Sequence, residues 1–242
     1  MQTQAEHDQR TPPTPQGGGA PETLRIWLLG GFKVSVGSRS IGEQEWHLRK
    51  AVSLLKLLAL AHGHRLHREQ AMDLLWPDLE PKAALNNLNY ALHVGRRTLE
   101  PSALAGSAAS RYLHLQGEQL VLCLDSPLWV DAEAFEEAAV TARHALEPAA
   151  FRAAIDLYTG ELLPGDRYEA WVEERRAELR GLYLSLLLAL ATLYEERKEF
   201  ELGIEALSRV VGEEPTHEGA HGGLMRLYAL LGRRREALSP RS

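Results

Sequence analysis

The chain has 242 residues, of which 45% are hydrophobic and 25% charged, a composition typical of one or two soluble globular domains. Its single cysteine, Cys123, excludes an internal disulfide framework and a zinc site built on several cysteines. The net charge of −6 is uneven, because residues 24–124 carry 12 Lys/Arg against 8 Asp/Glu, whereas residues 125–242 carry 14 against 22. We therefore expect an anion-binding surface in the first part of the chain.

The first 23 residues contain the sequence TPPTPQGGGAP and no apolar run. Proline and glycine at this density predict a disordered arm over residues 1–23 and no secretory signal. Later apolar stretches, such as residues 54–61 and 182–193, are interrupted by polar residues and too short to cross a bilayer. We expect a cytoplasmic protein with no membrane partner.

Strand-like and helical patterns alternate over residues 24–124. Apolar runs separated by glycines predict short antiparallel strands at residues 24–30, 33–36 and near 40–41. Apolar residues at helical spacing, closed by Gly63, Pro77 and Pro101, predict helices over residues 48–61, 68–76 and 81–100. In the second helix, Leu66, Ala71, Leu74 and Leu75 are expected to face inward.

A hairpin follows the third helix. Residues 111–115 and 119–124 are predicted as strands around a turn at Gly117, after a small-residue loop at 103–110. Cys123 falls in this apolar run and is interpreted as a buried, inert thiol. Strands, three helices and a hairpin are the order of a winged helix-turn-helix DNA-binding domain, which we assign to residues 24–124.

Residues 125–242 are predicted to be all-α, so the fold class is mostly α with a small β part. Five helices are expected, at residues 131–147, 149–158, 168–197, 202–212 and 218–231. Leu190, Leu193 and Tyr194 recur 34 residues later as Leu224, Leu227 and Tyr228. This period is typical of tetratricopeptide repeats, although two unrelated amphipathic helices would share such residues by chance.

The third helix has a face suited to reading DNA. At 100° per residue, Leu85, Leu88, Leu92 and Leu99 fall on one side and can pack on the first two helices. The opposite side lacks acidic residues, includes Ala83 and Val94, and is flanked by Lys82, Asn89 and Arg96. Its candidate DNA-contacting residues are Asn86, Asn87, Tyr90, His93 and Arg97. Asparagine can pair with adenine and arginine with guanine in the major groove, whereas Arg96 and Arg97 also suit phosphate; the alternative is an ordinary solvated face.

Further cations are candidate phosphate contacts. Arg49 and Lys50 open the first helix, where cations and backbone amides favour phosphate. Arg111 is expected to begin the wing and reach a neighbouring phosphate or the minor groove. A generic surface position is the alternative for all three residues.

No constellation in the sequence supports catalysis, a metal or a cofactor. The cluster of His62, His64 and His67 lacks an adjacent cysteine or aspartate at ligand spacing and is interpreted as polar loop residues. There is no phosphate-binding loop of the GxxxxGK type and no serine nucleophile elbow. We therefore predict that the protein is not an enzyme.

Several motifs together resemble the Streptomyces antibiotic regulatory protein family. They are LRIWLLGGFKVSV, LRKAVSLLKLLAL, HRLHREQAMDLLWPD, NNLNYALHVGRRTLEP and WVDAEAFE, and they are specific in combination. The later stretch FRAAIDLYTGELLPGDRYEAWVEERRAELR resembles the bacterial transcriptional activator domain of the same family. The resemblance covers about residues 24–238.

The resemblance implies a winged helix of the response-regulator type joined to a tetratricopeptide-like domain at residues 125–242. Such proteins bind direct repeats near promoters, with two copies on DNA, and recruit RNA polymerase. Within the matched segment, Trp76, Asp78 and Glu80 correspond to the loop that meets polymerase. Compared with the family, no receiver domain precedes the winged helix, and the second repeat is expected to be truncated at ALSPRS.

The sequence thus predicts a sequence-specific transcriptional regulator, an activator, whose partners are double-stranded DNA and RNA polymerase. The alternative is a scaffold in which the helical repeats bind a partner peptide and the winged fold no longer reads DNA. The acid-free face of the third helix favours the first hypothesis.

Overall fold

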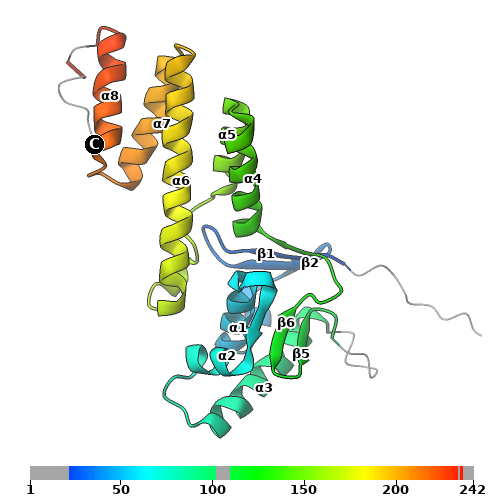
Figure 1. The fold of residues 1–242 in the computed structure, drawn as a ribbon. Helices are drawn as coiled ribbons and strands as arrows, with labels where there is room; N and C mark the ends of the chain where they lie inside the picture. The colour runs from blue at the N-terminus through cyan, green and yellow to red at the C-terminus, as the bar shows by residue number, and fades with distance from the viewer. Residues whose placement is uncertain (1–21, 102–109, 234, 237–242) are drawn as a thin grey trace, which may run out of the picture.

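The structure is a computed structural model, and it describes residues 22–101, 110–233 and 235–236. Most of the predicted arm at residues 1–23, the loop at 103–110 and the terminal ALSPRS lie outside the described residues. The described part is mostly helical with a small β part, as predicted. Figure 1 shows β-containing and helical halves that follow one another along the chain.

A four-stranded sheet opens the fold. Strands β1 (Leu24–Trp27), β2 (Lys33–Val36) and β3 (Arg39–Ile41) are antiparallel neighbours, which confirms the three predicted strands. A fourth strand, β7 (Leu128–Val130), pairs in parallel with β1, giving the order β3-β2-β1-β7. The sequence did not predict β7, because three residues directly before a helix show no alternation.

The winged helix-turn-helix layout is confirmed. Helices α1 (Arg49–Leu60), α2 (Arg68–Leu75) and α3 (Pro81–Leu99) lie within two residues of their predicted bounds. The wing is the hairpin of β5 (Leu113–Gln116) and β6 (Gln119–Leu122), whose turn contains Gly117 with φ of 61°. A further short strand, β4 (Arg65–His67), pairs with β6.

Two local expectations in this half are wrong. Leu74, expected to face inward, is 40% exposed, because α2 has only eight residues and packs through Ala71 and Leu75. Cys123 lies beyond the end of β6 with φ of 53°, so the predicted strand over 119–124 ends two residues early. The Cys123 side chain is half-buried rather than buried as predicted, but desolvation still raises the pKa of its thiol to about 12, with Glu100 adding to the shift.

The second half is a stack of helices. Their bounds are α4 (Asp131–Ala145), α5 (Pro148–Leu157), α6 (Ala170–Glu196), α7 (Phe200–Glu213) and α8 (Glu218–Leu230). Helix α6 packs against both α5 and α7, and α7 packs against α8 (Figure 1). Leu190 and Tyr194 on α6 are buried in the core, and so are Leu224 and Leu227 on α8, the counterparts of Leu190 and Leu193.

Helix α6 is long and apolar enough, by length and composition only, to cross a membrane. Ten of its residues are buried in the fold, including Leu186 and Leu187, which are fully inaccessible. Apolar residues all around a helix are also expected for one enclosed by neighbours in a protein core. The packing against α5 and α7 accounts for the apolar surface of α6.

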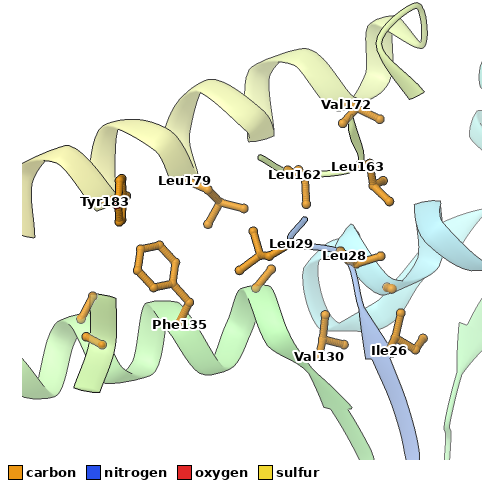
Figure 2. Close-up of a cluster of buried hydrophobic side chains, with 14 of the residues drawn as sticks. Ile26, Leu28, Leu29, Val130, Phe135, Leu162, Leu163, Val172, Leu179 and Tyr183 are labelled. Atoms are coloured by element: carbon orange, nitrogen blue, oxygen red, sulfur yellow. The ribbon is translucent and has the colours of Figure 1, made fainter. Parts of the chain in front are cut away.

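The two halves share one core at the exit of β1. Figure 2 shows Leu28 and Leu29, which follow β1, packed among Leu162 and Leu163 of the loop before α6 and Phe135 of α4. Leu29 forms a β-bridge with Leu162, and the Leu163 amide donates to the Leu28 carbonyl at 2.8 Å. These contacts join the winged half to the helical half.

The side chain of Asp131 completes this junction. One carboxylate oxygen accepts from the Leu28 amide at 2.8 Å, and the other accepts from the Leu29 amide at 2.9 Å. Asp131 is 3% exposed and also caps the amide of Ala132 at the start of α4. Strand β7 pairs with β1, and Asp131 binds the two residues that follow β1. The predicted domain boundary after residue 124 therefore separates β7 from the sheet to which it belongs.

Candidate nucleic-acid interface

Helix α3 lies at the end of the molecule opposite α7 and α8 (Figure 1). Pro81 occupies its first turn, where the missing amide hydrogen is tolerated. The helix buries Leu88, Ala91 and Leu92 against the core, so its other face points to solvent.

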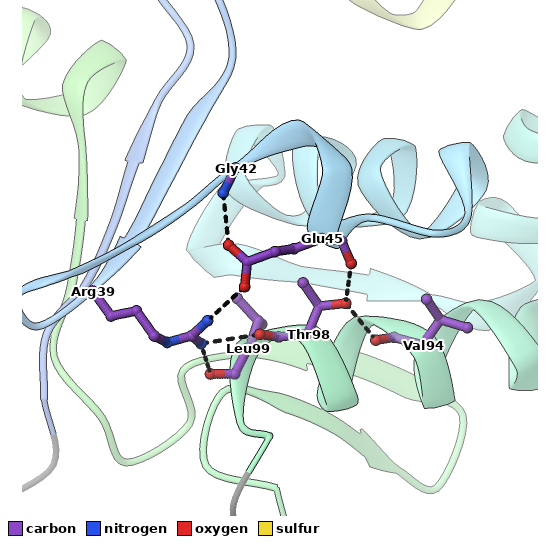
Figure 3. Close-up of polar contacts among 6 residues, drawn as sticks. All are labelled: Arg39, Gly42, Glu45, Val94, Thr98 and Leu99. Carbon is purple, nitrogen blue, oxygen red and sulfur yellow. Dashed lines mark hydrogen bonds and ion pairs between the residues drawn. The ribbon is translucent and has the colours of Figure 1, made fainter.

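The C-terminal end of α3 is fastened by the first sheet. Figure 3 shows Arg39, the first residue of β3, donating to the carbonyls of Thr98 and Leu99 at 3.0 and 2.7 Å. Glu45 pairs with the same guanidinium at 3.2 Å and accepts from the Gly42 amide. A cation at the last carbonyls of a helix complements the helix dipole. The orientation of α3 is therefore fixed from β3.

The wing holds the other side of the same helix. Gly95 lies so close to β5 that a Cβ atom would sit 2.8 Å from a methyl carbon of Leu113. Arg96 donates from Nε to the Leu113 carbonyl at 2.9 Å. A side chain at position 95 would therefore require the Leu113 side chain to shift.

Most of the predicted DNA-contacting face is exposed. Asn86, Asn87, Tyr90, His93 and Arg97 all lie on the solvent side of α3, and Tyr90 is 60% exposed. The helix contains no acidic residue from its first to its last position. The structure thus brings these five side chains together on the solvent side of α3, flanked by Lys82 and Asn89.

Val94 and Arg96 differ from the sequence-based picture. Val94, expected among the exposed residues, is buried and belongs to the hydrophobic core. Arg96 is half-buried and already bonds the wing, so its Nε supports the position of β5. Arg97 stands exposed one position further on, and its side chain forms no hydrogen bond or ion pair with the residues that the structure describes.

The other predicted phosphate contacts lie at separate places. Arg49 is exposed and Lys50 half-buried at the start of α1, where no side chain caps the helix. Arg111 is exposed but lies two residues before β5, at the base of the wing rather than in its strand. The tip of the wing carries Glu118, which is bonded by Arg68 at 2.5 Å and by His67 at 3.2 Å.

The loop between α2 and α3 exposes a mixed acidic and apolar surface. Asp78 and Glu80 are exposed, whereas Trp76 is half-buried against the core. Leu79, between the two acidic residues, is 42% exposed. The sequence reasoning singled out Trp76, Asp78 and Glu80 but missed Leu74 and Leu79, which no helical pattern could mark as exposed.

The histidines have structural roles. His67 caps α2 by accepting from the Glu69 amide at 3.3 Å, and His64 lies 3.2 Å from Glu133 of α4. Across the part of the chain that the structure describes, no group of three or more His, Cys, Asp or Glu is arranged to hold a metal ion.

A winged helix with an exposed, acid-free helix face, followed by stacked helices, is the arrangement expected for a class of bacterial regulators. Residues 130–240 match the family described as the bacterial transcriptional activator domain. No curated protein sequence matches the chain. The matched domain supports the predicted resemblance to the Streptomyces antibiotic regulatory protein family over the second half of the chain, and the winged helix has the layout that this resemblance implies.

Among solved structures, EmbR of Mycobacterium tuberculosis, in complex with a low-affinity phosphopeptide, has a similar fold. The TM-score is 0.73 at 18% sequence identity, and the match covers 90% of this chain. The chain spans 57% of the EmbR chain, so the shared part is the fold of the winged and helical halves.

Proposed function

We propose that the chain is a sequence-specific DNA-binding regulator that activates transcription in the cytoplasm. The observation that carries the proposal is the exposed face of α3, where three asparagines and Arg97 stand without an acidic residue. Asparagine is a poor helix former, so its repeated use in the middle of a helix argues for a function other than stability.

In this proposal α3 enters the major groove of the duplex. Asn86, Asn87 and Arg97 contact base edges, and Tyr90 and His93 contact bases or sugar. Arg49, Lys50 and Arg111 contact phosphates on either side, with Arg96 holding the wing in place. Because residues 24–124 are only net +4, one copy binds weakly, and two copies on direct repeats gain affinity from effective concentration.

The loop between α2 and α3 is the proposed contact to RNA polymerase. Leu79 supplies an exposed apolar anchor, and Asp78 and Glu80 supply charge complementary to a basic surface. This loop precedes the helix that reads DNA, so a polymerase bound next to the operator lies within its reach.

The test is selection of bound duplexes from a randomised pool with the full chain, at two salt concentrations. We expect enrichment of a repeated motif with half-sites about 10–11 base pairs apart, one helical turn. The matched variants are Asn86→Ala/Asn87→Ala/Arg97→Ala, which loses enrichment, and Arg143→Ala on α4, which keeps it. Retention without enrichment, or no retention at low salt, would overturn the proposal and favour the scaffold hypothesis.

A further inference from the structure

A second surface lies on the helical half, far from α3. Helices α5 and α7 both pack against α6, and a groove with a cavity of about 170 Å³ lies over α6 between them. The cavity is lined by Arg152, Leu187, Leu190, Tyr194, Leu202, Glu205, Ala206 and Arg209. Its floor is apolar, and its two arginines stand on opposite walls.

The volume of the cavity limits what it can hold. A cavity of about 150 Å³ lined by apolar side chains accommodates a benzene ring, whereas most small-molecule sites reach about 300 Å³ or more. The cavity therefore fits one leucine-sized or phenylalanine-sized side chain rather than a complete ligand. Leu202, which is 40% exposed at the rim, extends the apolar surface outwards.

The groove is lined by net positive charge, whereas the helical half as a whole is negatively charged. Residues 125–242 are net −8, yet the groove carries two arginines against the single carboxylate of Glu205. Several other arginines on α6 and at its end pair with glutamates, as Arg175 does with Glu136 and Arg197 with Glu147. Arg152 and Arg209 have no carboxylate partner among the described residues.

Arg209 is turned towards the groove by an aromatic contact. Its guanidinium lies 5.7 Å from the ring of Tyr183 and donates to the Tyr183 hydroxyl at 2.9 Å. Glu205 lies one helical turn earlier on α7, the spacing at which an ion pair is ordinarily favourable. The pair does not form, so the charge of Arg209 is not neutralised and remains available to a binding partner.

We propose that this groove docks an acidic protein segment that inserts one apolar side chain between α5 and α7. Arg152 and Arg209 bind carboxylates that flank the inserted residue, and Leu187, Leu190 and Ala206 enclose its side chain. An apolar anchor between charge-assisted hydrogen bonds is the recurring design of short-segment recognition. The proposal is independent of DNA binding, because the groove and α3 lie on different halves of the molecule.

The experiment is selection of random displayed peptides of about 12 residues on the full chain, a length sufficient for one anchor and its flanks. The recovered peptides are then synthesised with a fluorophore and titrated by anisotropy. We expect a shared Leu, Ile, Met or Phe with Asp or Glu within a few positions on either side.

Arg152→Glu is the decisive variant, because Arg152 is exposed and supports no other contact in the described structure. We expect it to weaken binding by about tenfold or more, roughly the loss of one charge-assisted contact. Arg143→Glu on α4 is the matched control and should bind as the native chain does. A peptide with its acidic residues changed to lysine should bind Arg152→Glu better than the native chain.

Three outcomes would overturn the proposal. They are the absence of any enriched peptide, enrichment of peptides without acidic residues, and equal binding to the native chain and Arg152→Glu. None of these outcomes depends on whether α3 binds DNA.

Discussion

Lys56 on α1 forms an ion pair with Asp166, 2.6 Å away, in the loop before α6 of the helical half. The two side chains are only 9% and 18% exposed, and the ammonium also lies 4.8 Å from the ring of Phe32. The nearly buried Lys56 ammonium is tolerated because the carboxylate of Asp166 pairs with it, and this carboxylate belongs to the other half of the chain. The pair therefore links the orientation of the winged half to that of the helical half.

Replacing one member of this pair should destabilise the chain more than replacing both. Asp166→Leu leaves the Lys56 ammonium nearly buried without a carboxylate, at a cost of about 2–4 kcal/mol, whereas Lys56→Met/Asp166→Leu should cost about half of that or less. Urea unfolding of the three proteins measures the difference. An equal loss of unfolding free energy in the single and double variants would contradict the expectation that the unpaired Lys56 ammonium causes most of the cost.

Asp131 should be intolerant of replacement by asparagine. An asparagine retains one acceptor oxygen but directs its amide group at the amide hydrogen of Leu28 or Leu29, leaving a buried donor unpaired at a cost of about 1–3 kcal/mol. Thermal unfolding should report a lower midpoint for Asp131→Asn. Asp156→Asn, on the exposed side of α5, is the control and should unfold like the native chain.

Arg97 and Arg96 should have different effects on DNA binding, although they are adjacent. Arg97→Ala should either relax base preference or reduce the dependence of log K on log salt by about one unit, because about 0.9 of a unit is lost with each phosphate contact. Arg96→Ala removes the hydrogen bond to Leu113 and should lower thermal stability as well. Unchanged affinity, specificity and salt dependence for Arg97→Ala would remove this residue from the interface.

The loop between α2 and α3 should separate activation from DNA binding. Asp78→Lys/Glu80→Lys reverses two exposed charges and leaves the buried surface of α3 untouched, so operator affinity should be retained or rise slightly. Transcription in a reconstituted polymerase reaction should fall severalfold. Full activation by this variant would show that polymerase does not use the loop.

Cys123 should make stability depend on alkaline pH. An ordinary thiol ionises near pH 8.5, whereas burial raises the pKa of Cys123 to about 12, so the folded chain keeps a proton that the unfolded chain releases. Above about pH 8.5 the native chain should lose up to about 1.4 kcal/mol per pH unit relative to Cys123→Ala. Below that pH the difference should be constant. Urea unfolding of both proteins at pH 7 and pH 10 tests this expectation.

Helix periodicity and breaker residues were sufficient to predict the long elements. The bounds of α1, α2 and α3 follow from apolar spacing together with Gly63, Pro77 and Pro101, and the wing follows from two apolar runs around Gly117. The short strands β4 and β7 could not be predicted, since each has three residues and depends on a partner far away in sequence. Their existence is decided by tertiary pairing rather than local pattern.

The sequence predicted which side chains of α3 are exposed, but only to the extent that the periodicity of a single helix reveals it. The helical wheel identified the exposed asparagines, Tyr90, His93 and Arg97, because α1 and α2 cover the opposite side. It misplaced Val94, which is buried in the hydrophobic core, since a helical wheel contains none of the elements that pack around the helix. Lys56 likewise interrupts an apolar run, and nothing in the sequence indicates a partner 110 residues away.

The parallel pairing of β1 with β7 determines when the first sheet can form during translation. Leu24 of β1 pairs with Leu128 of β7. About 100 further residues must therefore be synthesised before the second edge of β1 can form its hydrogen bonds with β7. Such distant pairings are slow to form, because loop closure must precede the stabilising contact. The winged half thus completes its sheet only after the start of the matched domain at residue 130 has been synthesised, and a nascent chain released before Val130 would expose an unpaired strand edge.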